Sequence, residues 1–205
     1  MKTRNQSSSE PRAIPFWHHQ NSVPHYEAGE RMQLITYRLF DSMASGTLAQ
    51  FKDQIEVGAD KLNPKQLVRM EAYLDKGRGS CMLRHEPVAR MVSENLRHFD
   101  QTKYNLHAWV VMPNHVHVLL TPNNGVLLSQ IVHSWKSYTS KKANEILNRT
   151  GDFWRRDYFD RLIRDERHYV KTVEYIHNNP VKAALCLTPG DWKFSSASIF
   201  MEQSR

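Results

Sequence analysis

Apolar and polar residues in the middle of the chain follow two spacings, and each spacing predicts one type of element. Residues 32–40 (MQLITYRLF) combine β-branched and aromatic side chains, which predicts a first strand. Residues 104–112 and 115–121 are two further strand-like runs on either side of Pro113-Asn114. Because Pro and Asn favour turn conformations, these two runs predict a β-hairpin.

A helical spacing of apolar residues marks three longer segments, residues 86–99, 127–148 and 166–178. Asp165 suits the N-cap of the third helix, and Pro180 is expected to end it because the residue before a proline avoids the α region. The residues expected to face the core are Val88, Met91, Val92, Leu96 and Phe99 in the first helix, Leu128, Ile131, Trp135, Tyr138 and Ile146 in the second, and Tyr169, Val170, Val173 and Ile176 in the third.

Shorter elements are predicted between the first strand and the first long helix. Residues 47–56 and 64–76 are expected to be helical, the latter with Asn63 as its N-cap and Pro64 at its first position. Residues 81–83 predict a brief strand.

The length of 205 residues suits one domain with extensions at its ends. Residues 1–28 are rich in Pro, Ser and His, and we expect an extended arm without a core of its own. Its histidines could form a metal tract, but they lack the spacing of a strand or helix, so a solvated arm is the better interpretation. The domain is predicted over residues 29–185, and residues 186–205 form a C-terminal tail.

Charge and cysteine content restrict the class of protein. Lys and Arg outnumber Asp and Glu by 28 to 21, for a net charge of +7, which favours a polyanionic partner such as nucleic acid. No apolar run approaches the ~18 residues of a membrane span, and the N-terminus lacks the apolar core of a signal peptide. Cys81 and Cys186 have no paired spacing, which excludes a cysteine-based zinc module. We therefore expect a reduced, cytoplasmic protein without a membrane partner.

His115 and His117 are two residues apart on a predicted strand, so both side chains project from one face of the sheet. Two imidazoles in this arrangement can bind one metal ion. The alternative is a pair of half-buried strand histidines that hydrogen-bond to backbone or water. The position of the pair directly after a Met-Pro-Asn turn favours the metal site.

Tyr175 and Asn179 are four residues apart on the third predicted helix, so they lie on the same side, about 40° apart around its axis. His177 is expected to point elsewhere. Beside two strand histidines, the amide oxygen of Asn179 can complete a metal face, and the phenol of Tyr175 can act as a nucleophile toward a phosphodiester polarised by the ion. The alternative is that Tyr175 is an ordinary packing residue of an amphipathic helix.

Several basic and aromatic residues are candidates for binding nucleic acid. The polar face of the second helix combines cations and hydroxyls, as phosphate contacts do, although a solvated helix face has the same composition. Residues 151–161 interleave aromatic and basic side chains, which suits base stacking but equally suits aromatics that close the core. The candidates for DNA binding are Lys136, Lys141, Lys142, Trp154, Arg155, Arg156 and Lys171.

Four stretches of sequence together resemble one known family. Leu106-His-Ala-Trp-Val-Val-Met-Pro-Asn-His-Val-His117 resembles the histidine–hydrophobe–histidine motif of the HUH superfamily. The stretches that begin at His133, Phe153 and Tyr175 (HSWKSY, FWRRDYFD and YIHNNPVK) are similar to the REP-associated tyrosine transposases, relatives of the single-tyrosine insertion-sequence transposases. The likeness covers roughly residues 14–197, and the order of its motifs makes it specific.

The resemblance implies a ferredoxin-like α+β HUH domain, with a central antiparallel sheet flanked by helices. It also implies that His115, His117 and Asn179 bind Mg²⁺ or Mn²⁺ and that Tyr175 forms a 5′-phosphotyrosine intermediate with release of a 3′-hydroxyl. Members of the wider single-tyrosine group commonly have glutamine where Asn179 stands. The shorter side chain leaves two alternatives open, a bridging water or coordination by Asn178.

The function expected from this resemblance is that of a metal-dependent single-stranded DNA endonuclease and strand transferase, transposase-like, acting beside REP-type hairpins. Its partner would be single-stranded DNA with such a hairpin and a guide tetranucleotide on its 5′ side, bound by a monomer or homodimer. One alternative is a non-catalytic DNA-hairpin-binding protein or repressor. Another is a metal phosphoesterase that activates water and leaves no protein–DNA adduct. Tyr138, Tyr158 and Tyr169 are the rival nucleophiles.

Overall fold

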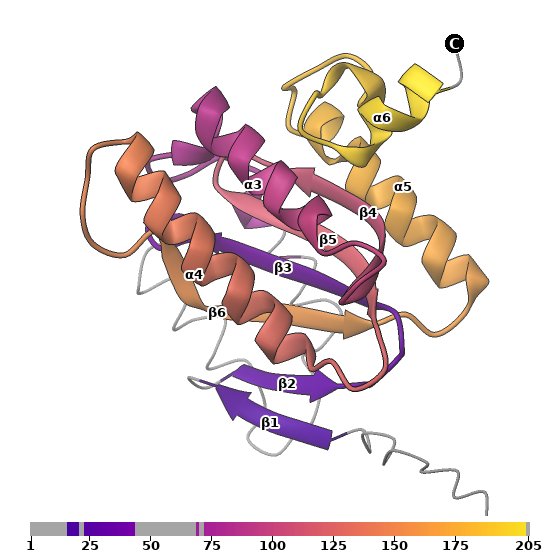
Figure 1. Ribbon diagram of the computed structural model, residues 1–205. Coiled ribbons are helices and arrows are strands. Elements are labelled where there is room, and N and C mark those ends of the chain that lie inside the picture. The colour runs from indigo at the N-terminus through magenta and orange to yellow at the C-terminus, as the bar shows by residue number, and fades with distance from the viewer. Residues whose placement is uncertain (1–15, 21–22, 44–68, 70–71, 204–205) are drawn as a thin grey trace, which may run out of the picture.

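The computed structural model describes residues 16–20, 23–43, 69 and 72–203 (Figure 1). The predicted helix 47–56 and most of 64–76, with Asn63 as its cap, lie outside the described residues. The elements are β1 (Phe16–Gln20), β2 (Val23–Glu27), β3 (Gln33–Leu39), η1 (Met82–Arg84), α3 (Glu86–His98), β4 (Tyr104–Val111), β5 (His115–Pro122), α4 (Leu128–Ile146), β6 (Trp154–Leu162), α5 (Glu166–Lys182), η2 (Pro189–Asp191) and α6 (Ser196–Gln203).

The central sheet contains four strands in the order β4-β5-β3-β6, and every neighbouring pair is antiparallel. Helix α3 connects β3 to β4 on the far side of β5, and α4 connects β5 to β6. This is the split β-α-β arrangement of ferredoxin-like domains, so the expected α+β class is confirmed. The predicted hairpin is also confirmed, with β4 and β5 joined through Met112, Pro113 and Asn114.

Helices α3 and α4 cover one face of the sheet (Figure 1). The core on this side contains the odd-numbered residues of β3, with Tyr37 at their centre, and the even-numbered apolar residues of β5. On α4, the buried residues are Leu128, Ile131, Val132, Trp135, Thr139 and Ala143. Tyr138 and Ile146 are 50% and 40% exposed, so their prediction as core residues is wrong. The buried stripe instead advances by steps of four residues, which carries it through Thr139 and Ala143.

Helix α5 covers the opposite face, where it packs Ile176 against Leu34, Val110 and Leu119 of the sheet. Asp165 is the N-cap as predicted, because its side chain accepts a hydrogen bond from the backbone N–H of His168. The predicted end before Pro180 is wrong, since α5 continues to Lys182. Pro180 lies so near the end that the helix loses little, and the N–H of Ala183 still donates to the carbonyl of Asn179.

Both ends of the chain contribute more structure than the sequence predicts. Strands β1 and β2 pair within the segment expected to be an extended arm. Glu27 of β2 is buried and accepts hydrogen bonds from the first backbone N–H groups of α4, at Leu128 and Ser129. In the predicted tail, Ser196 accepts a hydrogen bond from the N–H of Trp109 in β4. The domain boundaries at residues 29 and 185 remain predictions.

Residues 81–83 are not a strand, because η1 is a 3₁₀ turn that follows Cys81 in a left-handed conformation. No helix among the described residues is both long and apolar enough to cross a membrane.

Candidate active site

His115 and His117 project from β5 on the face covered by α5, and their Nε2 atoms are 3.1 Å apart. Nδ1 of His115 lies 2.7 Å from Oδ1 of Asn114. The amide nitrogen of Asn114 donates to two backbone carbonyls, so its oxygen is the acceptor and Nδ1 of His115 carries the proton. Nδ1 of His117 lies 2.8 Å from Oγ1 of Thr36 on the neighbouring strand. Each ring is therefore oriented through its Nδ1 atom, as metal-binding histidines usually are.

The proton on Nδ1 leaves Nε2 of His115 with a free lone pair, and Nε2 of His117 points into the same space. Burial lowers the pKa of His115 to about 3, and it also lowers the pKa of His117, helped by the neighbouring His115. Both imidazoles are therefore neutral, the form that binds a metal. Two ligands about 2.1 Å from an ion at a right angle are about 3.0 Å apart, close to the separation of these two atoms.

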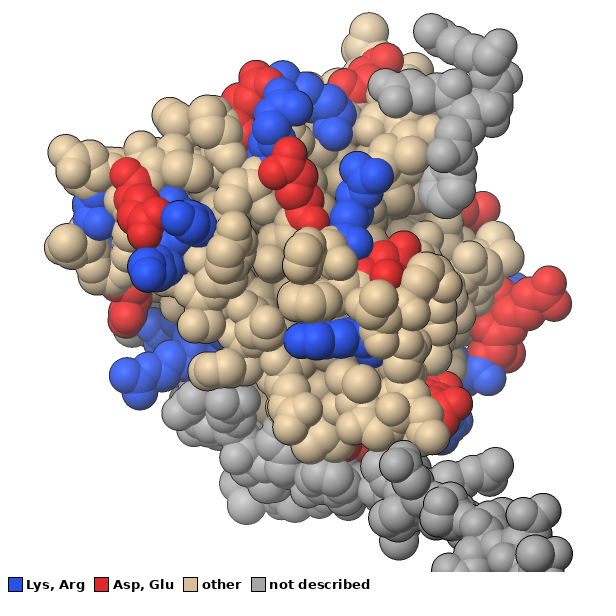
Figure 2. Space-filling view, in the orientation of Figure 1, with Lys and Arg blue, Asp and Glu red and all other residues tan. Residues whose placement is uncertain are grey.

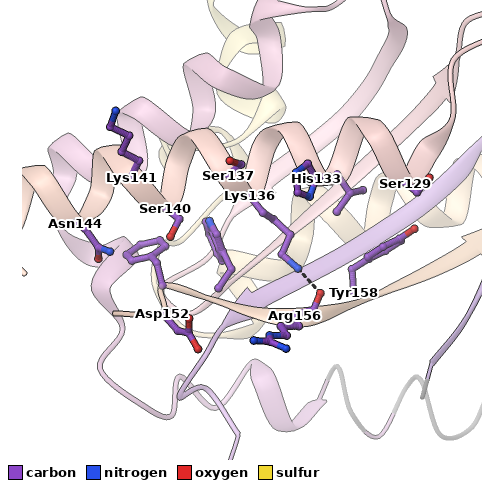
Figure 3. Close-up of a pocket in the computed structure, with 13 residues that line it drawn as sticks. Ser129, His133, Lys136, Ser137, Ser140, Lys141, Asn144, Asp152, Arg156 and Tyr158 are labelled. Atoms are coloured by element: carbon purple, nitrogen blue, oxygen red, sulfur yellow. Dashed lines mark hydrogen bonds between the residues drawn. The ribbon is translucent and has the colours of Figure 1, made fainter. Parts of the chain in front are cut away.

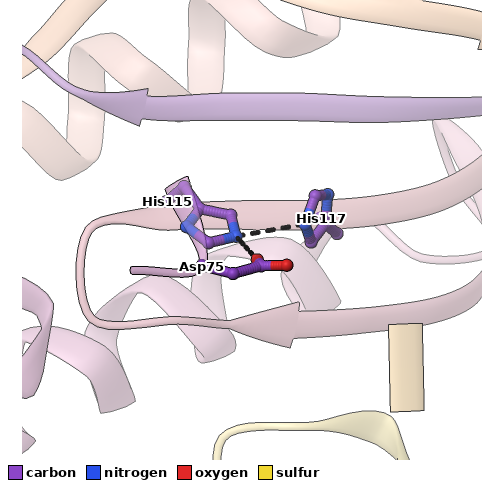
Figure 4. A group of neighbouring side chains, drawn as sticks. All are labelled: Asp75, His115 and His117. Carbon is purple, nitrogen blue, oxygen red and sulfur yellow. Dashed lines mark hydrogen bonds and ion pairs between the residues drawn. The ribbon is translucent and has the colours of Figure 1, made fainter. Parts of the chain in front are cut away.

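Asp75 is the third member of this group, which sequence reasoning did not identify. Its Oδ1 atom is 3.6 Å from Nε2 of His115, and the ligand atoms of Asp75, His115 and His117 all lie within 4.8 Å of one another (Figure 4). Asn114 holds the Asp75 segment against the hairpin through the carbonyls of Leu74 and Arg78. Burial raises the pKa of Asp75 to about 6, while the Asn179 amide and the Lys182 charge lower it. The carboxylate is thus ionised at neutral pH.

Tyr175 of α5 reaches the same group from the other side. Its hydroxyl lies 3.2 Å from Nε2 of His117. The ammonium of Lys182, two turns further along the helix, lies over the Tyr175 ring at 5.3 Å from its centroid. The phenol oxygen is therefore next to the atoms that would bind a metal ion.

Asn179 lies one turn after Tyr175 and is fully buried. Neither its Oδ1 nor its Nδ2 atom has a partner at hydrogen-bond distance and angle, although the amide lies close enough to Asp75 to lower the pKa of that carboxyl. A buried amide with so little hydrogen bonding is rare and fits a ligand of a cation. Asn178 instead donates to the carbonyl of Glu174 and lines an outer groove on α5 beside Lys171 and Tyr175. His177 points elsewhere, as expected, with Nε2 2.9 Å from Oγ of Ser196.

The rival tyrosines have other surroundings. Tyr138 is half-exposed on α4, and Tyr158 is buried with its ring stacked on His25 at 3.8 Å. Tyr169 packs edge-on against His107. The geometry therefore favours Tyr175 as the nucleophile.

The sequence model of the family described as "Transposase IS200 like" matches residues 80–179, a range that contains His115, His117, Tyr175 and Asn179. The chain is thus similar to this family over just under half of its length. Asp75 and Lys182 lie just outside the matched residues.

Two relatives and one solved structure agree with this similarity. The chain is 29% identical over 93 residues to the REP-associated tyrosine transposase of Escherichia coli strain K12, an overlap of 45% of this chain and 54% of that protein. It is 30% identical over 98 residues to an uncharacterised protein of Haemophilus influenzae, over 36% of this chain and 52% of that protein. The chain thus spans about half the length of these curated relatives.

The fold is similar to that of a REP-associated tyrosine transposase solved in complex with a REP hairpin. The TM-score is 0.50 at 19% identity, and the match covers 84% of this chain and 79% of that chain. This likeness supports the ferredoxin-like arrangement of the fold.

The structure distributes the predicted DNA-binding residues over two faces. Lys136, Lys141 and Arg156 line a cavity between α4 and β6, whereas Lys171 lines the outer groove on α5. Trp154 is 6% exposed, and its indole N–H donates to Oγ1 of Thr139, so little of its ring is available for base stacking. The exposed Lys142 pairs with Glu145. DNA contacts at these residues remain predictions.

Proposed function

We propose that this chain is a metal-dependent endonuclease and strand transferase for single-stranded DNA, which acts beside REP-type hairpins through Tyr175. The main support is the position of the Tyr175 hydroxyl, 3.2 Å from a histidine of the candidate metal site. The match of residues 80–179 to the model of the "Transposase IS200 like" family agrees with this chemistry.

The donor set of Asp75, His115 and His117, with the unpartnered amide of Asn179, fits a divalent cation such as Mg²⁺ or Mn²⁺. Bound there, the ion would supply Lewis-acid activation of a phosphodiester oxygen. The surrounding residues keep the metal-binding side chains neutral or anionic and correctly oriented. Thr36 and Asn114 orient the two rings, and burial keeps the rings neutral.

In the proposed step, the phenol oxygen of Tyr175 forms a bond to phosphorus while the bond from phosphorus to the 3′ oxygen breaks. The net proton transfer is from the phenol to the released 3′-hydroxyl. The phosphodiester energy is kept in the 5′-phosphotyrosine link, so a second hydroxyl can later rejoin the strand. Packing of α5 on the sheet through Ile176 fixes the direction from which Tyr175 approaches.

The substrate class follows from the relatives. One related structure contains a REP hairpin, so we propose a hairpin with a single-stranded 5′ flank as the substrate here.

A protein with reduced Cys81 and Cys186 would act in the cytoplasm.

A labelled single-stranded hairpin oligonucleotide with Mn²⁺ tests the proposal. The expected product is a protein–DNA adduct that survives denaturation and is absent when EDTA replaces Mn²⁺. Cleavage without an adduct would favour a phosphoesterase that activates water. Tight hairpin binding without cleavage would favour a repressor.

A further inference from the structure

Lys182 places a positive charge beside the candidate nucleophile. Its ammonium lies over the Tyr175 ring, 5.3 Å from the ring centroid. Along α5, Asn179 follows Tyr175 by four residues and Lys182 follows Asn179 by three, so the three side chains form one stripe of the helix. Asn179 is fully buried, Tyr175 is half-buried and Lys182 is exposed. The cation therefore stands where this stripe meets solvent.

The outer groove on α5 opens beside both Tyr175 and Lys182. It is a cavity of about 280 Å³ that Lys171 also lines. Lys182 lies close enough to Asp75 to lower the pKa of that carboxyl, so it is near the candidate metal group as well as the phenol. Lys171 is eleven residues earlier, about 16 Å away along the helix axis. Lys182 is thus the lysine of this groove that can reach the reacting atoms and Asp75 together.

The donors of Lys182 are free, unlike those of two lysines on α4. Acidic and basic side chains are interspersed over the face that carries α3 and α4 (Figure 2). On α4, Lys142 pairs with Glu145. Lys136 donates to the carbonyl of Arg156 across the cavity between α4 and β6 (Figure 3). Lys182 makes no hydrogen bond or ion pair with the residues that the structure describes, so its ammonium can bind a ligand.

The reaction proposed for Tyr175 gathers more negative charge than the candidate metal site can offset. Because His115 and His117 are neutral, the Asp75 carboxylate is the anionic member of the group and offsets half the charge of a divalent ion bound there. The phosphodiester carries one negative charge, and the phenol brings a second as it loses its proton. A cation held beside these atoms stabilises the charge that develops in the transition state.

A phosphate placed for attack by Tyr175 comes within reach of Lys182. Attack requires the phosphorus atom to lie about 3–3.5 Å from the phenol oxygen. An ammonium hydrogen-bonds a phosphate oxygen at about 2.7–2.9 Å, and the flexible four-carbon stem of the exposed Lys182 can adjust to that distance. The position of Lys182 over the ring leaves the hydroxyl free to face the metal group.

We propose that Lys182 is a further catalytic residue, whose ammonium donates a hydrogen bond to a non-bridging oxygen of the scissile phosphate while Tyr175 attacks. This inference rests on the proposed function. No bond to Lys182 forms or breaks, and the net proton transfer remains the one from the phenol to the released 3′-hydroxyl.

Two other roles would also account for the position of Lys182. A cation in the last turn of a helix interacts favourably with the helix dipole, which would make Lys182 a stabilising residue of α5. Alternatively, Lys182 would act only through Asp75, by keeping that carboxylate ionised for metal binding. The first role predicts a loss of stability and the second a loss of metal affinity, so each is distinguishable from a phosphate contact.

The first experiment compares single-turnover rates of adduct formation with a labelled hairpin and Mn²⁺. The test variant is Lys182→Gln, and Lys182→Arg restores the cation. Arg167→Gln is the control, because it removes the same charge from an exposed position of α5 outside the outer groove. Hairpin affinity in EDTA, Mn²⁺ affinity by calorimetry and the unfolding midpoint are measured for each protein.

We expect Lys182→Gln to slow adduct formation by at least about 100-fold, as loss of one donor to a transition-state oxyanion does. Its hairpin affinity and Mn²⁺ affinity should stay within about twofold, because the contact is made in the transition state. Lys182→Arg should recover most of the rate, and Arg167→Gln should keep it. A parallel loss of Mn²⁺ affinity would assign Lys182 to Asp75, and a lower midpoint with a normal rate would assign it to helix stability. Either result would overturn the proposal.

The second experiment requires no nuclease activity. Inorganic phosphate is titrated into the Mg²⁺-loaded proteins and its binding is measured by calorimetry. We expect Lys182→Gln to bind phosphate at least about 10-fold more weakly than the parent protein, since a hydrogen bond to a charged group is lost. Equal affinity in the two proteins, or no binding to the parent, would contradict the phosphate contact. If no protein forms an adduct, the proposed function fails, while the expected difference in phosphate affinity would still support this role of Lys182.

Discussion

His115 and His117 face each other with their Nε2 atoms 3.1 Å apart, and Nε2 of His115 is an acceptor because its Nδ1 atom donates to Asn114. With Nδ1 of His117 donating to Thr36, both Nε2 atoms would present lone pairs to one cation. The burial that keeps both rings neutral also removes water that would separate them. The pair is therefore preorganised for a metal ion.

Asp75 is predicted to contribute the anionic ligand. Asp75→Asn keeps the shape of the side chain but removes its charge, so we expect Mn²⁺ to bind at least about 10-fold more weakly, as measured by calorimetry. Asp152→Asn, at an exposed position outside the group, should leave the affinity unchanged. If Asp75→Asn binds Mn²⁺ normally while Asn179→Ala does not, the third ligand is the amide predicted from the sequence.

Thr36 is predicted to support metal binding without touching the ion. Thr36→Val removes the partner of His117 Nδ1, and loss of such an outer partner typically costs about 10–100-fold in metal affinity. Thr172→Val is a matched control, because Thr172 is a buried threonine of α5 whose hydroxyl donates to the carbonyl of His168. Equal metal affinity in both variants would contradict the role of Thr36.

Much of the fold is predictable because the sheet and long helices have strong periodicity. The buried face of α4 was the exception, because Tyr138 has an aromatic ring but its position on the helix faces solvent. The buried Glu27 was missed because a hydrogen bond to the start of α4, 101 residues away, leaves no local pattern. The β1–β2 pairing was missed for the same reason. No local pattern within residues 1–28 indicates which distant residues β1 and β2 will contact.

The candidate site was predicted where its residues share an element. His115 and His117 share a strand, and Tyr175 and Asn179 share a helix, so their spacing alone places each pair on one face. Asp75 comes from a third segment, and its proximity depends on the hydrogen bonds from Asn114 to the backbone of residues 74 and 78. The role of Asp75 is therefore visible only in the three-dimensional structure, where its carboxylate lies beside the two histidines.

Glu27 is predicted to stabilise the domain by capping α4 from a distant strand. Glu27→Ala leaves a buried N–H group at Leu128 and a partly buried one at Ser129 unpaired, so we expect the free energy of unfolding to fall by about 1–3 kcal/mol in urea titrations. Glu27→Gln retains one acceptor and should lose less. Glu30→Ala, at an exposed position, is the control. A Glu27→Ala protein as stable as this control would show that the cap contributes nothing.

Lys136 is predicted to make hairpin binding depend on pH. Burial and the nearby Arg38 lower its pKa to about 8, against the opposing effect of Asp157. The cation is therefore present at pH 7 and is lost as the pH rises through about 8, so hairpin affinity should fall by up to about 10-fold between pH 7 and pH 9. Lys136→Arg keeps its charge over this range and should show a flatter profile. Parallel profiles for both proteins would exclude Lys136 as the titrating group.

Tyr175 is predicted to be the nucleophile. Tyr175→Phe retains the ring that packs beside His117 and Lys182 but has no oxygen to attack phosphorus. We expect no cleavage and no denaturation-resistant adduct with hairpin DNA and Mn²⁺, together with unchanged hairpin binding and an unchanged unfolding midpoint. Two controls are Tyr169→Phe, on the same helix as Tyr175, and Tyr138→Phe, on α4. Both should still form the adduct, because neither ring lies beside the histidine pair. An adduct formed by the Tyr175→Phe protein would show that another residue attacks the strand.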